Sequence, residues 1–252
     1  MITLEANSYD LIKPLFAEIP GCLWIIAGME ERKFGRIFVD RLPNPETAYI
    51  ETPYFLYYTA GTLDKIFLDN VINHIVTNLI PDKEARPVFL FSTNHEWKSE
   101  IEKRLKEYNQ SNFGPYLTRR LHHLNQDLYF KMKESLKLLP NEYTVKMSLE
   151  NGETVVHAYY NDIEVCSCYD GGQGLGFMDF NVFTHPDHRN KGLASICCSK
   201  LIDHCIEHDI VPQWGCWTVN VTSCNLAKKL GFDITAETQV NFAEINKANP
   251  AV

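Results

Sequence analysis

The stretch THPDHRNKGLASICC, residues 184–198, places a short basic turn directly before an apolar segment. Apolar side chains then recur over one broad surface: Leu193, Ala194, Ile196, Cys197, Cys198, Leu201, Ile202, Cys205 and Ile206. This spacing predicts a largely buried helix that opens at Gly192.

The start of this helix is suited to binding an anion. The first turn of a helix has amide N–H groups without intrahelical partners, and the helix dipole is positive at that end. Gly192 lets a ligand approach the backbone closely, and Arg189 and Lys191 add positive charge. The same residues are also compatible with an ordinary solvated helix start, so the turn alone leaves both interpretations open.

The composition is that of a folded globular protein. The 252 residues suffice for two modest domains, and 45% of them are apolar. A formal net charge of −8 argues against broad binding of nucleic acid, which depends on Lys and Arg. The N-terminus has no basic region followed by an apolar core, and no run approaches the roughly 20 apolar residues of a membrane span. We expect a cytosolic protein without a nucleic-acid or membrane partner, and the oligomeric state stays open.

The cysteines and histidines give no sign of a metal site. The eight cysteines include no C-x-x-C pair, so we expect reduced thiols that serve as small buried hydrophobes. His185 with His188, and His204 with His208, have spacings that could ligate a metal. Neither pair has an obvious third ligand, so we expect no metal.

The first half of the chain alternates predicted strands and helices. Short apolar runs predict strands over 22–28, 35–40, 48–61 and 86–92. Helical spacing predicts helices over 62–81 and 95–108. The polar segment NQSNFGPY (109–116) is the expected boundary, which gives an N-terminal α/β domain over 1–115 and a second domain over 116–252.

The second half begins with a segment, 119–132, that fits a strand or a helix equally well. Three turn signals then separate alternating runs: Asn151-Gly152, Asn161-Asp162 and the glycine-rich GGQGLG (171–176). Such signals between alternating runs predict an antiparallel meander.

A second motif follows the predicted helix. After a predicted strand (212–219) comes NVTSCNLAKKLGF (220–232), in which Asn220 can cap a short helix and Gly231 can end it. The series of strand, R-x-x-G-x-A turn, helix, strand, N-x-x-S and K-L-G-F resembles the GNAT superfamily of acyl-CoA-dependent N-acyltransferases. The resemblance covers residues 118–252, and FTHPDHRNKGLA with PQWGCW looks most like the zwittermicin A resistance type, which also carries an N-terminal extension.

The resemblance implies a fold and a function. The fold is α/β, with a GNAT-like mixed central sheet flanked by helices and preceded by an N-terminal α/β domain, for which a degenerate GNAT-like half is one interpretation. The implied function is an acetyl-CoA-dependent N-acetyltransferase that transfers acetyl directly to a primary amine of a small molecule. Two alternatives remain: a non-catalytic CoA-binding or regulatory module, and an acetyltransferase that acts on a protein or peptide amine.

The resemblance also assigns the coenzyme A contacts. In the family, the Q/R-x-x-G-x-G/A loop wraps the pyrophosphate, and the strand before it, here 177–184, splays from its neighbour and offers backbone amides to the thioester. The implied cofactor-binding residues are Val182, Phe183, Thr184, Arg189, Asn190, Lys191, Gly192, Leu193, Ala194, Asn220 and Ser223. Asn220 contacts the pantetheine arm in this interpretation, and simply caps its helix in the other.

Transfer to an amine needs a base, because an amine with a pKa near ~10 is mostly protonated at neutral pH. Alternation along 177–184 places Asp179 on one face with Phe177 and Asn181. Asp179 is therefore the first candidate for general base, and Glu164 on the adjoining strand is the second.

The resemblance has two departures. Many family members carry a Tyr four residues before the Gly-Phe pair as proton donor to the thiol, and Ala227 stands there in this chain. Ser223 is the candidate donor in its place, whereas Cys224 is not expected to be a nucleophile, since the family transfers without an acyl-enzyme. The second departure is SLENGETVV (148–156), which leaves room only for a turn where the family has two helices that line the acceptor pocket. Either the acceptor site is open or the N-terminal domain closes it.

Overall fold

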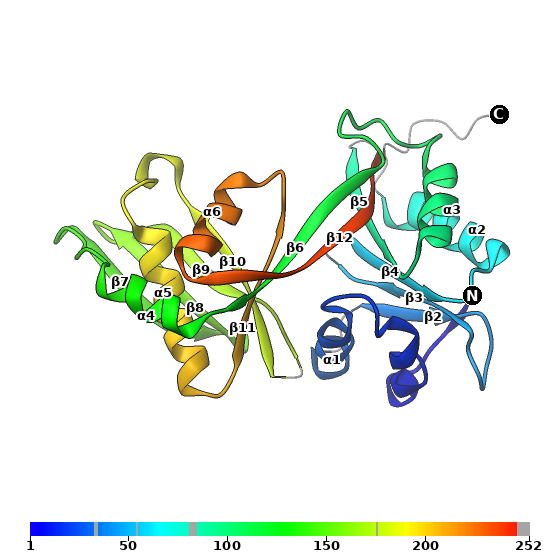
Figure 1. Cartoon of the computed structure of the whole chain (residues 1–252), viewed down its shortest axis with the longest axis horizontal. Helices are drawn as coiled ribbons and strands as arrows, with labels where there is room; N and C mark the ends of the chain where they lie inside the picture. The colour runs from blue at the N-terminus through cyan, green and yellow to red at the C-terminus, as the bar shows by residue number, and fades with distance from the viewer. Residues whose placement is uncertain (33–34, 54, 81–84, 175, 246–252) are drawn as a thin grey trace. The chain divides into compact units, whose positions relative to one another are not determined.

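A computed structural model of the chain describes residues 1–32, 35–53, 55–80, 85–174 and 176–245. The chain divides into two compact units (Figure 1): the first combines Met1–Arg119 with the chain from Thr238 onward, and the second is Arg120–Glu237. Strands β6 (Tyr116–Leu124) and β12 (Phe232–Ile245) each contribute residues to both units. The end of β12 thus groups with the first unit, whereas the sequence interpretation placed all of 116–252 in the second domain.

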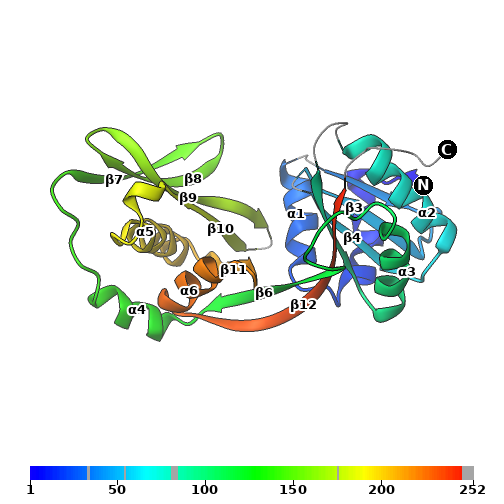
Figure 2. The ribbon, with the colours of Figure 1, turned by 90° about the horizontal axis from the view of Figure 1, so that it is seen from above.

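The first unit is a mixed sheet covered by helices on both faces. Its strand order is β1-β2-β3-β4-β5-β12, and only the β4–β5 pair among the strands with described registers is parallel. Figure 2 shows α2 and α3 on one side of the strands and α1 on the other. The elements are β1 (Ile2–Thr3), 3-10 helices Ala6–Leu11 and Lys13–Phe16, α1 (Cys22–Arg32), β2 (Arg36–Val39), β3 (Thr47–Glu51), β4 (Leu56–Gly61), α2 (Lys65–His74), a π-helical turn (Ile75–Leu79), β5 (Arg86–Ser92) and α3 (His95–Leu105).

Two sequence predictions in this unit are wrong. Residues 22–28, predicted as a strand, form the first part of α1. A short apolar run that is buried on all sides has the same pattern in a strand and in a helix, so periodicity could not decide between them. The predicted strand 48–61 is two strands, because the chain turns after Glu51 at Thr52-Pro53.

The strands of the second unit follow the order β12-β6-β11-β10-β9-β8-β7. The ambiguous segment 119–132 contains both a strand and a helix, β6 and α4. The predicted meander is confirmed, since Asn151, Gly152, Asn161 and Asp162 have positive φ in tight turns between antiparallel strands. The remaining elements are α4 (Gln126–Glu134), β7 (Tyr143–Glu150), β8 (Glu153–Tyr160), β9 (Ile163–Gly174), β10 (Phe177–Thr184), a 3-10 turn (Pro186–His188), α5 (Leu193–Glu207), β11 (Val211–Trp217) and α6 (Val221–Lys229).

The helices of the second unit share one face of its sheet (Figure 2). Tyr129 of α4, Cys197 of α5 and Ala227 of α6 belong to one buried core with Cys168 and Met178 of the sheet. Within the described residues of this unit, no helix covers the opposite face of β7–β10. The turn at Asn151-Gly152 joins β7 directly to β8, which confirms that no helices stand between these two strands. The mixed α/β fold that the sequence predicts is thus confirmed.

None of the helices in the described parts of the chain is both long enough and apolar enough to cross a membrane.

Candidate active site

The start of α5 leaves its backbone amides uncapped. Gly192 is the N-cap residue, with φ of 87°, and no side chain caps this end of the helix. The first intrahelical bond runs from Ile196 N–H to Gly192 O, at 3.1 Å, so the N–H groups of the residues between them lie ahead of it. A Cβ built on Gly192 would meet no atom within 4 Å. The space beside Gly192 is therefore open, next to amide donors that have no intrahelical partner.

Two exposed cations flank this turn, as the sequence predicts. Arg189 Nε donates to the Thr184 carbonyl at 3.1 Å. Lys191 Nζ donates to the Tyr143 hydroxyl at 3.2 Å, and the same hydroxyl lies 2.8 Å from His188 Nδ1. The residue between the two cations, Asn190, adopts a left-handed φ of 61°.

A third cation at this turn escaped the sequence analysis. Lys229, at the C-terminal end of α6, places its Nζ 3.0 Å from Ser195 Oγ in the first turn of α5. The Lys228-Lys229 pair before Gly231 was visible in the sequence, but nothing in the spacing indicated that α6 ends beside α5. Lys229, Arg189 and Lys191 together give the turn three positive charges, which suits it to binding a diphosphate.

Next to this turn, β10 separates from β11. The parallel ladder pairs Phe177–Asp179 with Val211–Gln213, while β10 continues to Thr184 paired with β9. Asp179 Oδ1 accepts from Gly215 N–H and from Phe180 N–H, each at 2.9 Å. In a continued β10–β11 ladder, a backbone carbonyl of β10 would accept the Gly215 N–H. Here the Asp179 carboxylate takes the place of that carbonyl. This side chain marks the point at which the strands part, before Val182, Phe183 and Thr184.

Glu164, the second candidate base, lies far from this point. It pairs with Tyr159, and its side chain is 45% exposed. Asp179 pairs with Gly172, eight positions further along β9. At about 3.3 Å per residue, the two carboxylates are separated by roughly 26 Å along the strand. The structure therefore does not bring the two candidate bases together.

The start of α6 holds the two candidate residues Asn220 and Ser223. Asn220 Oδ1 accepts from Ser223 N–H at 3.1 Å, which confirms Asn220 as a helix cap. Ser223 Oγ accepts the indole N–H of Trp214 at 3.0 Å, and this leaves the hydroxyl hydrogen of Ser223 for donation. Ala227, which replaces the family's tyrosine, is fully buried.

A histidine that the sequence analysis did not select lies beside the last rung of the β10–β11 ladder. Gln213, which is 4% exposed and pairs with Asp179, places its amide Nε2 2.9 Å from His123 Nε2. An amide nitrogen only donates, so His123 Nε2 accepts and the imidazole is neutral. Burial lowers the pKa of His123, which agrees with the neutral form. Alternation in β6 is the signal that could have found it, because it sends His122 and His123 to opposite faces.

The amide oxygen of Gln213, Oε1, has an unsatisfied hydrogen-bonding capacity. It is buried, and no hydrogen-bond partner for it exists among the residues the structure describes. A buried polar atom without a partner costs roughly 1–3 kcal/mol, so a ligand that supplied a donor here would be favoured. The imidazole of His123 also stacks on Phe177, with ring centroids 6.0 Å apart.

The sheet face opposite α5 combines acidic and aromatic side chains. His157 lies between two carboxylates, with Nε2 2.9 Å from Glu150 and Nδ1 3.2 Å from Glu164. A hydrogen bond from Ser148, followed by that from His157, lowers the pKa of Glu150. Phe183 is 53% exposed on β10. This face suits a cationic ligand with an apolar part.

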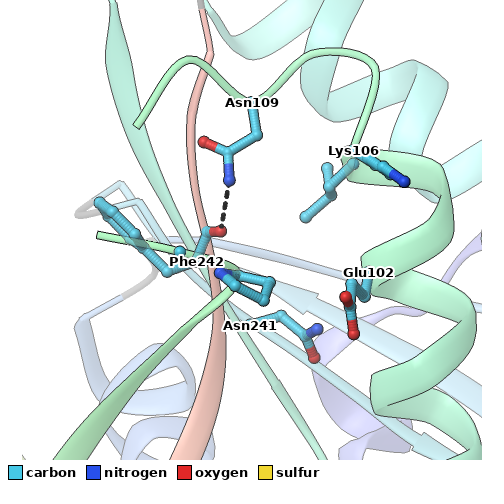
Figure 3. A pocket seen from close by; sticks show the side chains of 8 residues that line it. Glu102, Lys106, Asn109, Asn241 and Phe242 are labelled. Atoms are coloured by element: carbon cyan, nitrogen blue, oxygen red, sulfur yellow. Dashed lines mark hydrogen bonds between the residues drawn. The ribbon is translucent and has the colours of Figure 1, made fainter. Parts of the chain in front are cut away.

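A separate hollow lies in the first unit. A cavity of about 240 Å³ opens between α3 and β12 (Figure 3), and its lining includes Glu102, Lys106 and Phe242. Asn109 holds the loop over it, by donating to Phe242 O at 3.3 Å and accepting from Glu244 N–H at 3.1 Å. In the portions of the chain that the structure describes, no group of three or more His, Cys, Asp or Glu is placed to hold a metal ion.

Comparison with known proteins identifies the family. The GNAT acetyltransferase family model matches residues 13–161 and 150–240. This chain belongs to the GNAT acetyltransferase family. The uncharacterized N-acetyltransferase YdfB of Bacillus subtilis is 22% identical over 264 residues, which cover 95% of this chain and 97% of YdfB. The L-amino acid N-acyltransferase MnaT of Escherichia coli is 35% identical over 98 residues, 38% of this chain and 53% of MnaT.

Solved structures share the fold over nearly the whole chain. A GCN5-related N-acetyltransferase-like protein from Streptococcus suis superposes with a TM-score of 0.70 at 18% identity, over 95% of this chain and 99% of that one. A tandem GNAT protein from the clavulanic acid biosynthesis pathway has a TM-score of 0.65 at 11% identity, over 99% of each chain. The two units thus follow a tandem GNAT-like organisation.

Proposed function

We propose that this acetyltransferase uses acetyl-CoA to acetylate the primary amine of a small molecule, with amino acids as the first acceptor class to examine. The observation that carries the proposal is the uncapped, cation-flanked start of α5 beside the parted strands β10 and β11. The acceptor class follows from MnaT and from the L-methionine sulfoximine/L-methionine sulfone acetyltransferase of Salmonella typhimurium, which is 34% identical over 98 residues. The aminopolyols suggested by the zwittermicin A resistance type are the second class.

The cofactor's diphosphate fits the observed turn. The amides after Gly192 would bind its oxygens, and Arg189, Lys191 and Lys229 would balance its charge. Asn190, Leu193 and Ala194 complete the loop, and Val182, Phe183, Thr184 and Asn220 are assigned to the pantetheine arm. When bound, acetyl-CoA supplies an acetyl group activated as a thioester.

His123 is the proton acceptor in this proposal. A half-turn of the Gln213 amide on substrate binding, with His123 in its other neutral tautomer, would let Oε1 accept from His123 Nε2–H. Nδ1 would then carry the free lone pair that takes the amine proton. Asp179 is better suited to holding β11 beside β10, since its Oδ1 already accepts two backbone N–H groups. Glu164 lies roughly 26 Å along β9 from the level of Asp179, where the strands begin to part, and is too far from that point to take the proton there.

Two further groups complete the mechanism. Ser223 Oγ–H donates a proton to the leaving thiolate in place of the missing tyrosine. The carboxylates of Glu150 and Glu164 attract an ammonium group to the uncovered sheet face. Since no helix in the described residues of this unit covers that face, a peptide amine is the competing acceptor.

The experiment combines a binding and a turnover measurement on the whole chain. Calorimetric titration with acetyl-CoA tests the cofactor, and detection of free thiol during incubation with L-amino acids, aminopolyols and short peptides tests the acceptor. We expect binding at one site per chain and thiol release with small amines. Binding without release from any acceptor would support a CoA-binding module, release with peptides alone would support the peptide acceptor, and absence of binding would refute the proposal.

A further inference from the structure

Two thiols of the second unit lie within reach of each other. Cys216 on β11 and Cys224 on α6 place their Sγ atoms 3.4 Å apart. All eight cysteines are free, and Cys224 is the single one that is not fully buried. Cys224 is thus partly exposed, and the buried Cys216 thiol lies next to its sulfur.

A cation stands beside Cys224. Arg120 on β6 donates from Nε to Glu237 Oε1 at 2.6 Å. The hydrogen bond to Glu237, with smaller contributions from Cys224, raises the pKa of Arg120. The guanidinium thus donates to the carboxylate and interacts electrostatically with the nearby sulfur. A positive charge near a thiol assists its attack on an electrophile.

The other thiol pairs of this unit differ in access. The free thiol of Cys166 interacts with that of Cys197, and Cys168 with Cys198, across the contact between the sheet and α5. All four side chains are fully buried. Proximity alone is common in this core, so it is the combination of proximity, access and an adjacent cation that distinguishes Cys216 and Cys224.

We propose that Cys216 and Cys224 form a redox-sensitive pair that hydrogen peroxide converts to a reversible intramolecular disulfide. The Cys224 sulfur attacks one peroxide oxygen, the O–O bond breaks, and sulfenic acid and water form. The Cys216 sulfur then attacks the Cys224 sulfur, the S–O bond breaks, and a second water leaves. Two thiols thereby lose two electrons and two protons, and one peroxide is reduced to two waters.

Disulfide formation would alter the start of α6. A disulfide requires an S–S distance near about 2.05 Å, so α6 and β11 must shift relative to each other or rotate these side chains. Ser223 directly precedes Cys224 and accepts the Trp214 indole N–H. Oxidation should therefore change the intrinsic tryptophan fluorescence of the protein, whatever its enzymatic activity.

The experiment uses the reduced full-length protein and hydrogen peroxide. Tryptic cleavage after Lys200 and Lys228 yields the peptide 201–228, which contains Cys205, Cys216 and Cys224. After blocking of free thiols, we expect this peptide to have lost two hydrogens, with fragmentation that locates the bond between Cys216 and Cys224 and leaves Cys205 blocked as a free thiol. A reductant should restore the original mass and fluorescence.

Variants separate the roles of the two cysteines. Cys216→Ser should stop the reaction at a Cys224 sulfenic acid that dimedone traps, and Cys224→Ser should abolish both products. Arg120→Gln should slow oxidation several-fold, whereas the matched variant Cys205→Ser should leave the rate and the bond unchanged. Free Cys216 and Cys224 in peroxide-treated wild-type protein, or a bond to another cysteine, would overturn the proposal without bearing on the acetyltransferase site.

Discussion

The two units each contain a parallel pair of strands joined by a helix, and the starts of the two helices differ. In the first unit, Asp64 caps α2, and its Oδ1 accepts from Ile66 N–H at 2.8 Å and from Phe67 N–H at 3.0 Å. In the second unit, Gly192 begins α5 with no side-chain cap. A carboxylate in the position where an anion would bind excludes it by charge and by occupying the donors. The same architecture is therefore closed to a phosphate in one unit and open in the other.

The two strand pairs differ as well. Between β4 and β5 the ladder runs over Leu56–Thr59, close to the end of β4, and Thr59 Oγ1 bridges to Phe91 O at 3.2 Å. Between β10 and β11 the ladder ends at Asp179, five residues before β10 does. One unit keeps its strands joined and the other parts them beside the open helix start. In the proposed function, ligand binding thus depends on a few residues at two positions of a shared fold.

The change with the largest expected effect makes the second helix start resemble the first. Gly192→Asp places a carboxylate beside the open amides and in a left-handed conformation that Asp adopts at some cost. We expect a loss of acetyl-CoA affinity of at least about 100-fold by calorimetry, consistent with losing several charge-assisted hydrogen bonds. Gly192→Asn keeps the shape without the charge and should bind more tightly than the Asp variant. Equal affinity of the wild type and Gly192→Asp would place the cofactor elsewhere.

The next largest effect concerns His123. This side chain lies where β10 and β11 part, and the first unit has no such parting of β4 and β5. Without this base, His123→Gln should lower kcat by roughly 10²-fold, and KM for acetyl-CoA should change little. In the wild type, because burial lowers the pKa of His123, the acidic limb of the rate profile should lie below the ordinary value near about 6.5. That limb should vanish in the variant. An unaltered acidic limb in His123→Gln would assign the proton to another group.

His123 also gives a prediction about stability, with a definite sign. Its folded-state pKa is lower than its unfolded-state pKa, so the unfolded chain binds more protons as pH falls between the two values. Stability should therefore decline as pH falls below about 6.5. In denaturant titrations across this range, His123→Gln should lose less stability than the wild type, and an identical pH dependence would contradict the neutral imidazole.

Asp179 offers a test of the parted strands themselves. Asp179→Asn keeps an oxygen acceptor for Gly215 N–H, whereas Asp179→Ala leaves that partly buried donor without its acceptor. If the Asp179 carboxylate only holds β11 beside β10, the Asp179→Asn variant should retain most of the turnover. The Asp179→Ala variant should lower the free energy of unfolding by roughly 1–3 kcal/mol, measured from denaturant midpoints. Loss of turnover in the Asn variant, with a normal midpoint, would instead restore Asp179 as the base.

Local sequence signals predicted the second unit well. Positive-φ turn residues, the Gly192 start and the Asn220 cap are decided by neighbouring residues, so α5, α6 and the meander were correct. The run 22–28 was misassigned, because a fully buried apolar run has no periodicity to indicate its helix. Lys229 beside Ser195 and His123 beside Gln213 are contacts between segments 34 and 90 residues apart. Only the tertiary fold creates such contacts, so single-sequence reasoning could not select these residues.

The smallest expected effect removes the cap of the first helix. Asp64→Ala takes away the acceptor of two amide N–H groups and should lower the unfolding free energy by about 1 kcal/mol, while Asp64→Asn, which keeps an acceptor, should lose less. Neither variant should change acetyl-CoA affinity or the one-per-chain stoichiometry, because β4 and β5 of the first unit stay paired close to the end of β4, whereas β10 and β11 part. Binding of a second acetyl-CoA molecule by Asp64→Ala in calorimetry would show that the capping carboxylate alone prevents the first unit from binding the cofactor. The difference between the two strand pairs would then not be needed to explain why the wild type binds one molecule per chain.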